Sequence, residues 1–202
     1  ADQFPPRLEA GPDPSGIQPM QHAYQMCSLG GHVITTSLVR GNVTLPGNLF
    51  SIGGITHHGG QCFKVTFGDL TLVFDPISKN ASLPAVRFGA DIALVSRNHP
   101  DMNGVEEVTY GDKTPLAITG PGEYERRGVV VQGFSSKSAY GLAKGETEAI
   151  NTIYSVELED MTLVHLGALS ETELGKEARE SIEEIDVLFV PVGGDGVLTA
   201  AK

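Results

Sequence analysis

A pattern of alternating apolar and polar residues, present twice, constrains the fold of this chain more than any other feature. The stretch 63–74 (FKVTFGDLTLVF) alternates on both sides of Gly68-Asp69, and the stretch 154–165 (YSVELEDMTLVH) repeats that pattern. Strict alternation is typical of a half-buried strand, and a two-residue turn between two such strands predicts a β-hairpin. Each half of the chain is therefore expected to contain a hairpin with one apolar face.

Each predicted hairpin is followed by a short apolar run, 91–95 (DIALV) and 186–190 (DVLFV). Such runs are typical of strands buried on both faces. Between the second hairpin and its buried strand, Ser170 and Glu173 have the spacing of a helix capping box. An apolar stripe for that helix is formed by Leu174, Ala178, Ile182 and Ile185. We expect an α/β fold in which two related halves with outer helices form an αββα sandwich. Chance similarity of two amphipathic hairpins is the alternative.

The charge balance bears on the class of partner. The 202 residues carry 14 Lys and Arg against 25 Asp and Glu, a net charge of −11, which does not suit a nucleic-acid binder. No apolar run approaches the roughly 18–20 residues that span a bilayer. Cys27 and Cys62 do not make a disulfide framework. We expect a cytoplasmic protein with a small-molecule substrate and no nucleic-acid or membrane partner, and self-association stays open.

Residues 1–54 differ in composition from the rest of the chain. They carry only five charged side chains and gather several prolines among Gly and Gln. This composition is typical of an irregular leader. We expect residues 1–54 to be a weakly ordered N-terminal extension and residues 55–202 to be the folded domain. Within the leader, β-branched residues from His32 onward favour a strand without indicating its partner.

Polar residues mark the ends of the predicted strands. Asp75 and His165 end the two hairpins, and the loops 96–104 and 193–196 follow the buried strands. Rigid strands position such loops for binding or catalysis. If the two halves are related by a twofold axis, all four of these strand ends converge on one cleft.

Three residues at these strand ends are candidate metal ligands. His99, Asp101 and His165 offer two imidazoles and a carboxylate, which zinc accepts. Scattered surface or core histidines are the alternative. His57 and His58 are adjacent in a strand-like stretch, so their rings point to opposite faces and do not share one metal.

The order of several motifs resembles the metallo-β-lactamase fold, most of all the branch similar to ascorbate-6-phosphate lactonase, a group of predicted zinc-dependent hydrolases. The resemblance covers about residues 55–202 and lies in 55–63 (ITHHGGQCF), 73–76 (VFDP), 120–125 (GPGEYE) and 164–167 (VHLG). The family's metal loop, Thr-His-x-His-x-Asp-His, corresponds here to residues 96–102 (SRNHPDM).

This resemblance implies an impaired metal site. His99, Asp101 and His165 match family ligands, whereas Arg97 and Met102 replace histidines and Ala168 replaces a bridging aspartate. The implied cofactor is one zinc ion at most, with Asp101 as the catalytic carboxylate. Asp75 is expected to support the ligands from behind. The family's last metal histidine lies beyond a further strand, so the domain is expected to be incomplete at its C-terminus.

Two functions follow from the resemblance. In the first, metal-bound water attacks an ester, lactone or phosphoester of a small anionic substrate that Arg97 and Arg126 bind. In the second, the chain is a degenerate, non-catalytic member that serves as a binding or scaffolding module. A partial gene product lacking both roles is a third, weaker alternative.

Overall fold

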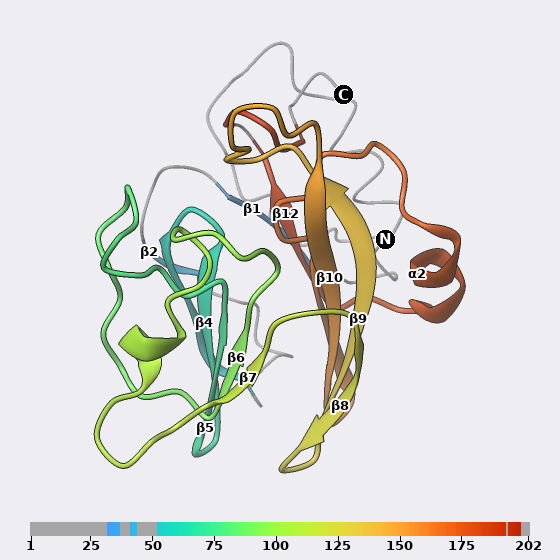
Figure 1. Ribbon diagram of the computed structural model, residues 1–202. Coiled ribbons are helices and arrows are strands. Elements are labelled where there is room, and N and C mark those ends of the chain that lie inside the picture. Colours follow the sequence, from blue (N-terminus) through green and yellow to red (C-terminus); the bar gives the residue numbers. More distant parts are fainter. Residues whose placement is uncertain (1–31, 37–40, 44–51, 193, 199–202) are drawn as a thin grey trace, which may run out of the picture.

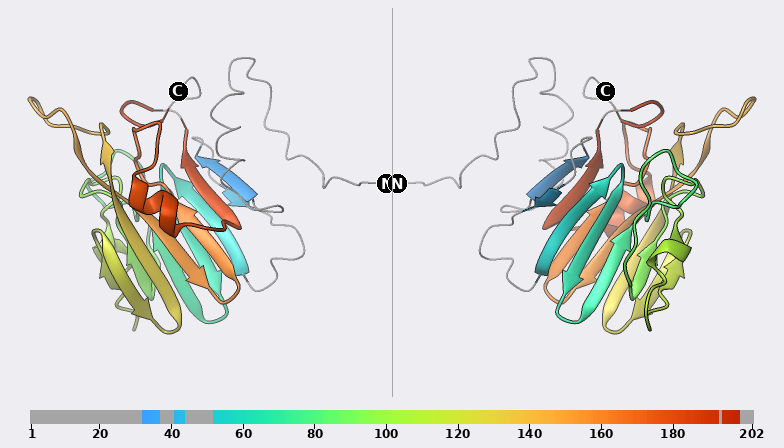
Figure 2. Two further views of the ribbon diagram at one scale, coloured as in Figure 1. Left: turned by 90° about the vertical axis from the view of Figure 1, so that its right-hand side faces the viewer. Right: turned by 90° about the vertical axis from the view of Figure 1, so that its left-hand side faces the viewer.

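The computed structural model describes residues 32–36, 41–43, 52–192 and 194–198, which form two six-stranded mixed sheets packed face to face (Figures 1 and 2). One sheet contains, in spatial order, β2 (Gly41–Val43), β3 (Ile52–Gly59), β4 (Cys62–Phe67), β5 (Leu70–Phe74), β6 (Ile92–Leu94) and β7 (Leu116–Ile118). The other contains, in spatial order, β8 (Gly122–Arg126), β9 (Val129–Ser138), β10 (Ala149–Leu158), β11 (Met161–His165), β12 (Val187–Pro191) and β1 (His32–Thr36). The predicted two-sheet sandwich is confirmed.

The two sheets repeat one pairing scheme. In each, three antiparallel pairings are followed by two parallel ones. The hairpins have the same register, because Phe63 pairs with Phe74 as Tyr154 pairs with His165. Each hairpin is also followed by a parallel buried strand, β6 or β12. The sequence repeat is therefore a structural repeat.

The main core lies between the sheets. It contains the apolar face predicted for the first hairpin, in which Phe63, Val65, Leu72 and Phe74 are completely buried, while Phe67 is only partly buried. On the facing sheet, the buried Tyr154 hydroxyl lies 2.8 Å from the Val95 carbonyl oxygen, to which it donates. This bond ties the end of β6 to the opposite sheet.

A short helix, α2 (Lys176–Ser181), covers the outer face of the β8–β12 sheet (Figure 1). All four residues of the predicted apolar stripe pack there, but only Ala178 lies within the helix, which is shorter than predicted. The predicted capping box is wrong, because the helix begins after Gly175. Instead, the Ser170 hydroxyl donates to the Lys137 carbonyl (3.3 Å), and the Glu171 carboxylate accepts the Lys137 amide (3.1 Å). These bonds to β9 hold the stretch extended.

The outer face of the other sheet is covered by the loop 76–91 and a 3₁₀ helix, η1 (Val105–Val108). Cys62 is buried beneath them, as expected for a small apolar residue. In the described part of the chain α2 is the only α-helix, so the outer layers contain less helix than an αββα sandwich implies. None of the described helices has the length and hydrophobicity needed to cross a membrane.

Two stretches of the predicted leader form strands. β1 pairs in parallel with β12, and β2 pairs antiparallel with β3, so each adds an edge to a sheet. The partner of β1 could not be identified from sequence because β12 lies near the other end of the chain. Residues 1–31, 37–40 and 44–51 lie outside the described residues.

Candidate functional site

The predicted strand ends meet at one edge of the sandwich. Asp75, directly after β5, accepts hydrogen bonds from the Ser96 amide and the Ser96 hydroxyl, both at 2.7 Å, and Ser96 follows β6. His165, the last residue of β11, has its Nε2 atom 3.9 Å from Asp75 Oδ2. Val197, beyond β12, packs against Met102 and Ala168. The predicted convergence is therefore present.

His165 is enclosed by protein on all sides. Its Nε2 lies 3.1 Å from the Gln61 carbonyl, and its Nδ1 accepts the Gly167 amide at 3.1 Å, which assigns the proton to Nε2. The ring stacks on Phe74 with centroids 4.8 Å apart. Burial lowers the pKa of His165 to about 3, so the ring is neutral. Both ring nitrogens are thus engaged with the backbone.

Asp75 is fully buried behind His165. Burial raises the pKa of its carboxyl to about 7, although the two bonds from Ser96 oppose that shift. The 3.9 Å separation from His165 is too long for a hydrogen bond. Asp75 therefore holds the β6 loop through Ser96 rather than orienting the imidazole directly.

Asp101 is held by the loops around it. The Ser82 amide donates to Oδ1 at 2.9 Å, and the Tyr140 hydroxyl donates to Oδ2 at 2.7 Å. Burial acts to raise the pKa of Asp101, but these bonds and the nearby His99 outweigh it and lower the pKa. The carboxylate is charged, and both of its oxygens accept hydrogen bonds.

His99 is next to Asp101, with Nδ1 3.7 Å from Asp101 Oδ2. Its Nδ1 accepts the Asp101 amide at 3.2 Å, and its ring lies edge-on to Tyr140. Its Nε2 faces Gly141, where a Cβ atom would come within 2.6 Å. About a quarter of the side chain is exposed, toward a depression of about 330 Å³ that Asn98 and Asn103 also line.

Two residues that stand where the family resemblance implies metal ligands, Met102 and Ala168, pack together. Met102 and Ala168 form a small apolar cluster with Val197, and Tyr140 packs against it. Asn151, buried in β10, fixes Ala168 in place by accepting its amide hydrogen at 2.8 Å. Sequence reasoning missed Asn151, although a polar residue within an apolar strand was a usable signal. It also missed Tyr140, whose bond to a residue distant in sequence leaves no such signal.

The structure separates the two arginines proposed to bind substrate. Arg97 follows β6 at the converged strand ends and is 7% exposed. Arg126 is exposed at the end of β8, beside Arg127, which pairs with Asp69 in the β4–β5 turn. That turn is at the opposite end of β5 from Asp75. Arg126 therefore does not belong to the same site.

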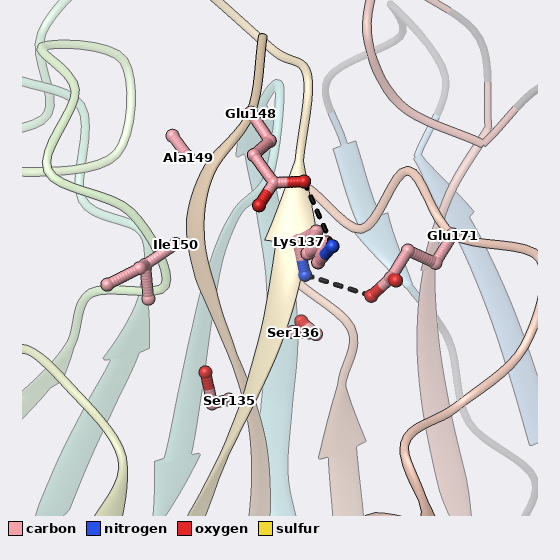
Figure 3. A pocket seen from close by; sticks show the side chains of 7 residues that line it. All are labelled: Ser135, Ser136, Lys137, Glu148, Ala149, Ile150 and Glu171. Carbon is pink, nitrogen blue, oxygen red and sulfur yellow. Dashed lines mark hydrogen bonds and ion pairs between the residues drawn. The ribbon is translucent and has the colours of Figure 1, made fainter.

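A second depression, of about 370 Å³, is lined by residues of β9 and β10 and by Glu171 (Figure 3). Each of its charged groups already has a partner, because Lys137 Nζ lies 3.0 Å from a Glu148 oxygen and the Lys137 amide donates to Glu171. The exposed Ile150 forms part of its wall.

The predicted zinc ligands do not fit a metal in this arrangement. His165 has both nitrogens bonded to backbone, Asp101 accepts a hydrogen bond at each carboxylate oxygen, and His99 Nε2 faces Gly141. Within the described residues, no group of three or more His, Cys, Asp or Glu side chains is arranged to hold a metal ion. Arg97 also places a fixed positive charge in the same loop.

Comparison with known families decides the relationship. The Beta-lactamase superfamily domain matches residues 54–202. The chain belongs to this superfamily. The match begins within β3 and therefore leaves β1 and β2 outside it. No curated protein matches the chain.

Two solved structures share the fold. A "putative Zn-dependent hydrolase of the metallo-beta-lactamase superfamily" from Thermotoga maritima is 31% identical, with a TM-score of 0.52 over 69% of this chain. This chain spans only 61% of the length of that protein. A "putative metal-dependent hydrolase" from Parabacteroides distasonis is 13% identical, with a TM-score of 0.55, covering 81% of this chain and 79% of that one. The chain therefore has the fold of metal-dependent hydrolases of the β-lactamase superfamily.

Proposed function

We propose that this chain is a ligand-binding member of the β-lactamase superfamily that works without a bound metal. The observation that carries the proposal is the engagement of His165, whose two ring nitrogens bond Gln61 and Gly167. A histidine ligates a metal through an unprotonated nitrogen, so one of these bonds would have to be given up. The apolar contact of Met102 with Ala168 and the buried charge of Arg97 support the same conclusion.

Zinc binding tests this proposal directly. The full chain, purified without chelator, is expected to contain far less than one equivalent of zinc and to show no saturable heat in a calorimetric zinc titration. The variant R97H/A168D restores a third histidine and a carboxylate at the positions where the family resemblance places ligands, and it is expected to bind zinc more tightly than the parent. One equivalent of zinc in the parent, lost in His99→Ala and His165→Ala but not in His57→Ala, would overturn the proposal.

A second candidate is a hydrolase that cleaves an ester, lactone or phosphoester of a small anionic substrate. The 31% identity to a protein described as a "putative Zn-dependent hydrolase" favours it, as does the presence of His99, Asp101 and His165. This candidate requires His165 to give up its bond to Gln61 or to Gly167 before it binds an ion. Zinc-dependent hydrolysis by the parent that His165→Ala abolishes would establish it.

We also propose the class of partner and the location. The net charge of −11 favours a small molecule over a nucleic acid as partner. The presence of only two cysteines in 202 residues is consistent with the reducing cytoplasm. The same proposal includes association of the chain into a homo-oligomer, which sedimentation of the full chain over a range of concentrations tests.

A further inference from the structure

Arg97 is the group at this site whose bonding is least complete. Its side chain is 7% exposed, yet its Nε and Nη1 atoms have no hydrogen-bond partner among the described residues. Its one bond is a long contact of 3.4 Å from Nη2 to the Gly141 carbonyl. Because a guanidinium has five donor hydrogens and stays charged, burying it this way is strongly unfavourable.

No acid of the described residues neutralises Arg97. The described residues form eight ion pairs within 4.0 Å, and the Arg97 guanidinium takes part in none of them. Asp101, four residues away, is occupied by Ser82 and Tyr140. Glu146 acts on Arg97 only at longer range, and one of its oxygens accepts the Ala143 amide at 3.0 Å.

The loop that joins β9 to β10 covers Arg97 and His99 together. Gly141 in that loop provides the carbonyl that Arg97 contacts, and a Cβ atom added to Gly141 would come within 2.6 Å of His99 Nε2. The loop extends beyond the two sheets at the edge where the strand ends converge (Figure 2).

We propose that Arg97 binds a small oxyanion, a carboxylate or phosphate group, beneath the β9–β10 loop. Carboxylates and phosphates present several acceptor oxygens that match the planar donors of a guanidinium. In this site the guanidinium provides the positive charge that attracts an anion. The inference rests on the proposed function, since it requires that no metal occupies the site.

The test uses the full chain and two arginine variants. Inorganic phosphate and acetate are titrated at constant ionic strength while the melting temperature and the binding heat are measured. At least one of the two anions is expected to raise the melting temperature of the parent with a saturable dependence. Arg97→Met is expected to weaken that binding at least about tenfold, because a hydrogen bond to a charged group is lost.

Arg126→Met is the matched control, because it removes the same charge from an exposed position at the other end of the sandwich. It is expected to bind as the parent does. Arg97→Met is also expected to melt at a higher temperature than the parent without anions, which shows that it folds and that the buried charge was uncompensated. No saturable effect of either anion, or equal losses in both variants, would overturn the inference. A parent that binds zinc would instead overturn the proposed function, so the two failures are distinguishable.

Discussion

At the scale of single residues, Asp75 and His165 have opposite effects on the dependence of stability on pH. Asp75 has its pKa raised by burial from 3.8 to about 7, so its contribution is present below about pH 4 and is lost as the pH rises through 7. His165 has its pKa lowered by burial from 6.5 to about 3, so its contribution is present above pH 6.5 and is lost as the pH falls. Between about pH 4 and 6.5 the two effects offset each other.

The variant Asp75→Asn exposes the effect of His165 alone. Its free energy of unfolding is expected to fall as the pH is lowered from 6.5 to 4.5, by up to about 1.4 kcal/mol per pH unit relative to the parent. Asparagine keeps a carbonyl acceptor for the Ser96 amide, so the loop contact is preserved. Urea melts in EDTA-containing buffer measure the difference, and parallel pH profiles for variant and parent would contradict it.

The residue types at the predicted strand ends indicated a candidate site, but they did not indicate how its side chains are bonded. Asp101 and His165 stand out in the sequence because carboxylates and imidazoles follow predicted strands. Their partners are invisible there, because Tyr140 reaches Asp101, and Gln61 reaches His165, across long stretches of chain. Whether a candidate ligand is free or engaged depends on contacts that only the folded chain brings together.

At the scale of elements, β4 provides a graded test of burial. Phe63 is fully buried and stacks on His57, whereas Phe67 beside the hairpin turn is only partly buried. Phe63→Ala is expected to reduce the free energy of unfolding by about 3–5 kcal/mol. Phe67→Ala, the control on the same face of the same strand, is expected to cost less, within roughly 0.5–3 kcal/mol. Denaturant melts check the order, and equal losses would show that the two positions are equally packed.

Sequence periodicity predicted the hairpins well because alternation and turn chemistry are local properties. It placed the helix poorly because Ser170 and Glu171 bond Lys137 of β9 instead of capping the helix. The same limit explains β1, whose composition indicated a strand but whose partner is β12. Local patterns specify elements, and distant partners decide where those elements end and pair.

At the scale of the whole molecule, β1 and β2 protect the edges of the two sheets. Without them β12, whose side chains are all buried, and β3 would present unpaired backbone groups. A chain of residues 54–202, the extent of the superfamily match, is therefore expected to associate and to unfold at lower temperature than the full chain. A chain of residues 32–202 keeps both strands and is the control. Sedimentation over a range of concentrations measures the difference, and identical behaviour of the two shortened chains would refute it.

The strand order also determines when each part of the fold can form during synthesis. The sheet from β2 to β7 uses one continuous stretch, residues 41–118, so its strands are synthesised one after another with no strand of the other sheet between them. The other sheet closes only when β1, made before all of these, pairs with β12, the last strand described. Pairing across so long a stretch is slow, and until it occurs β1 is an open template for wrong partners. The first described strand to be synthesised therefore cannot pair until the last one has been made.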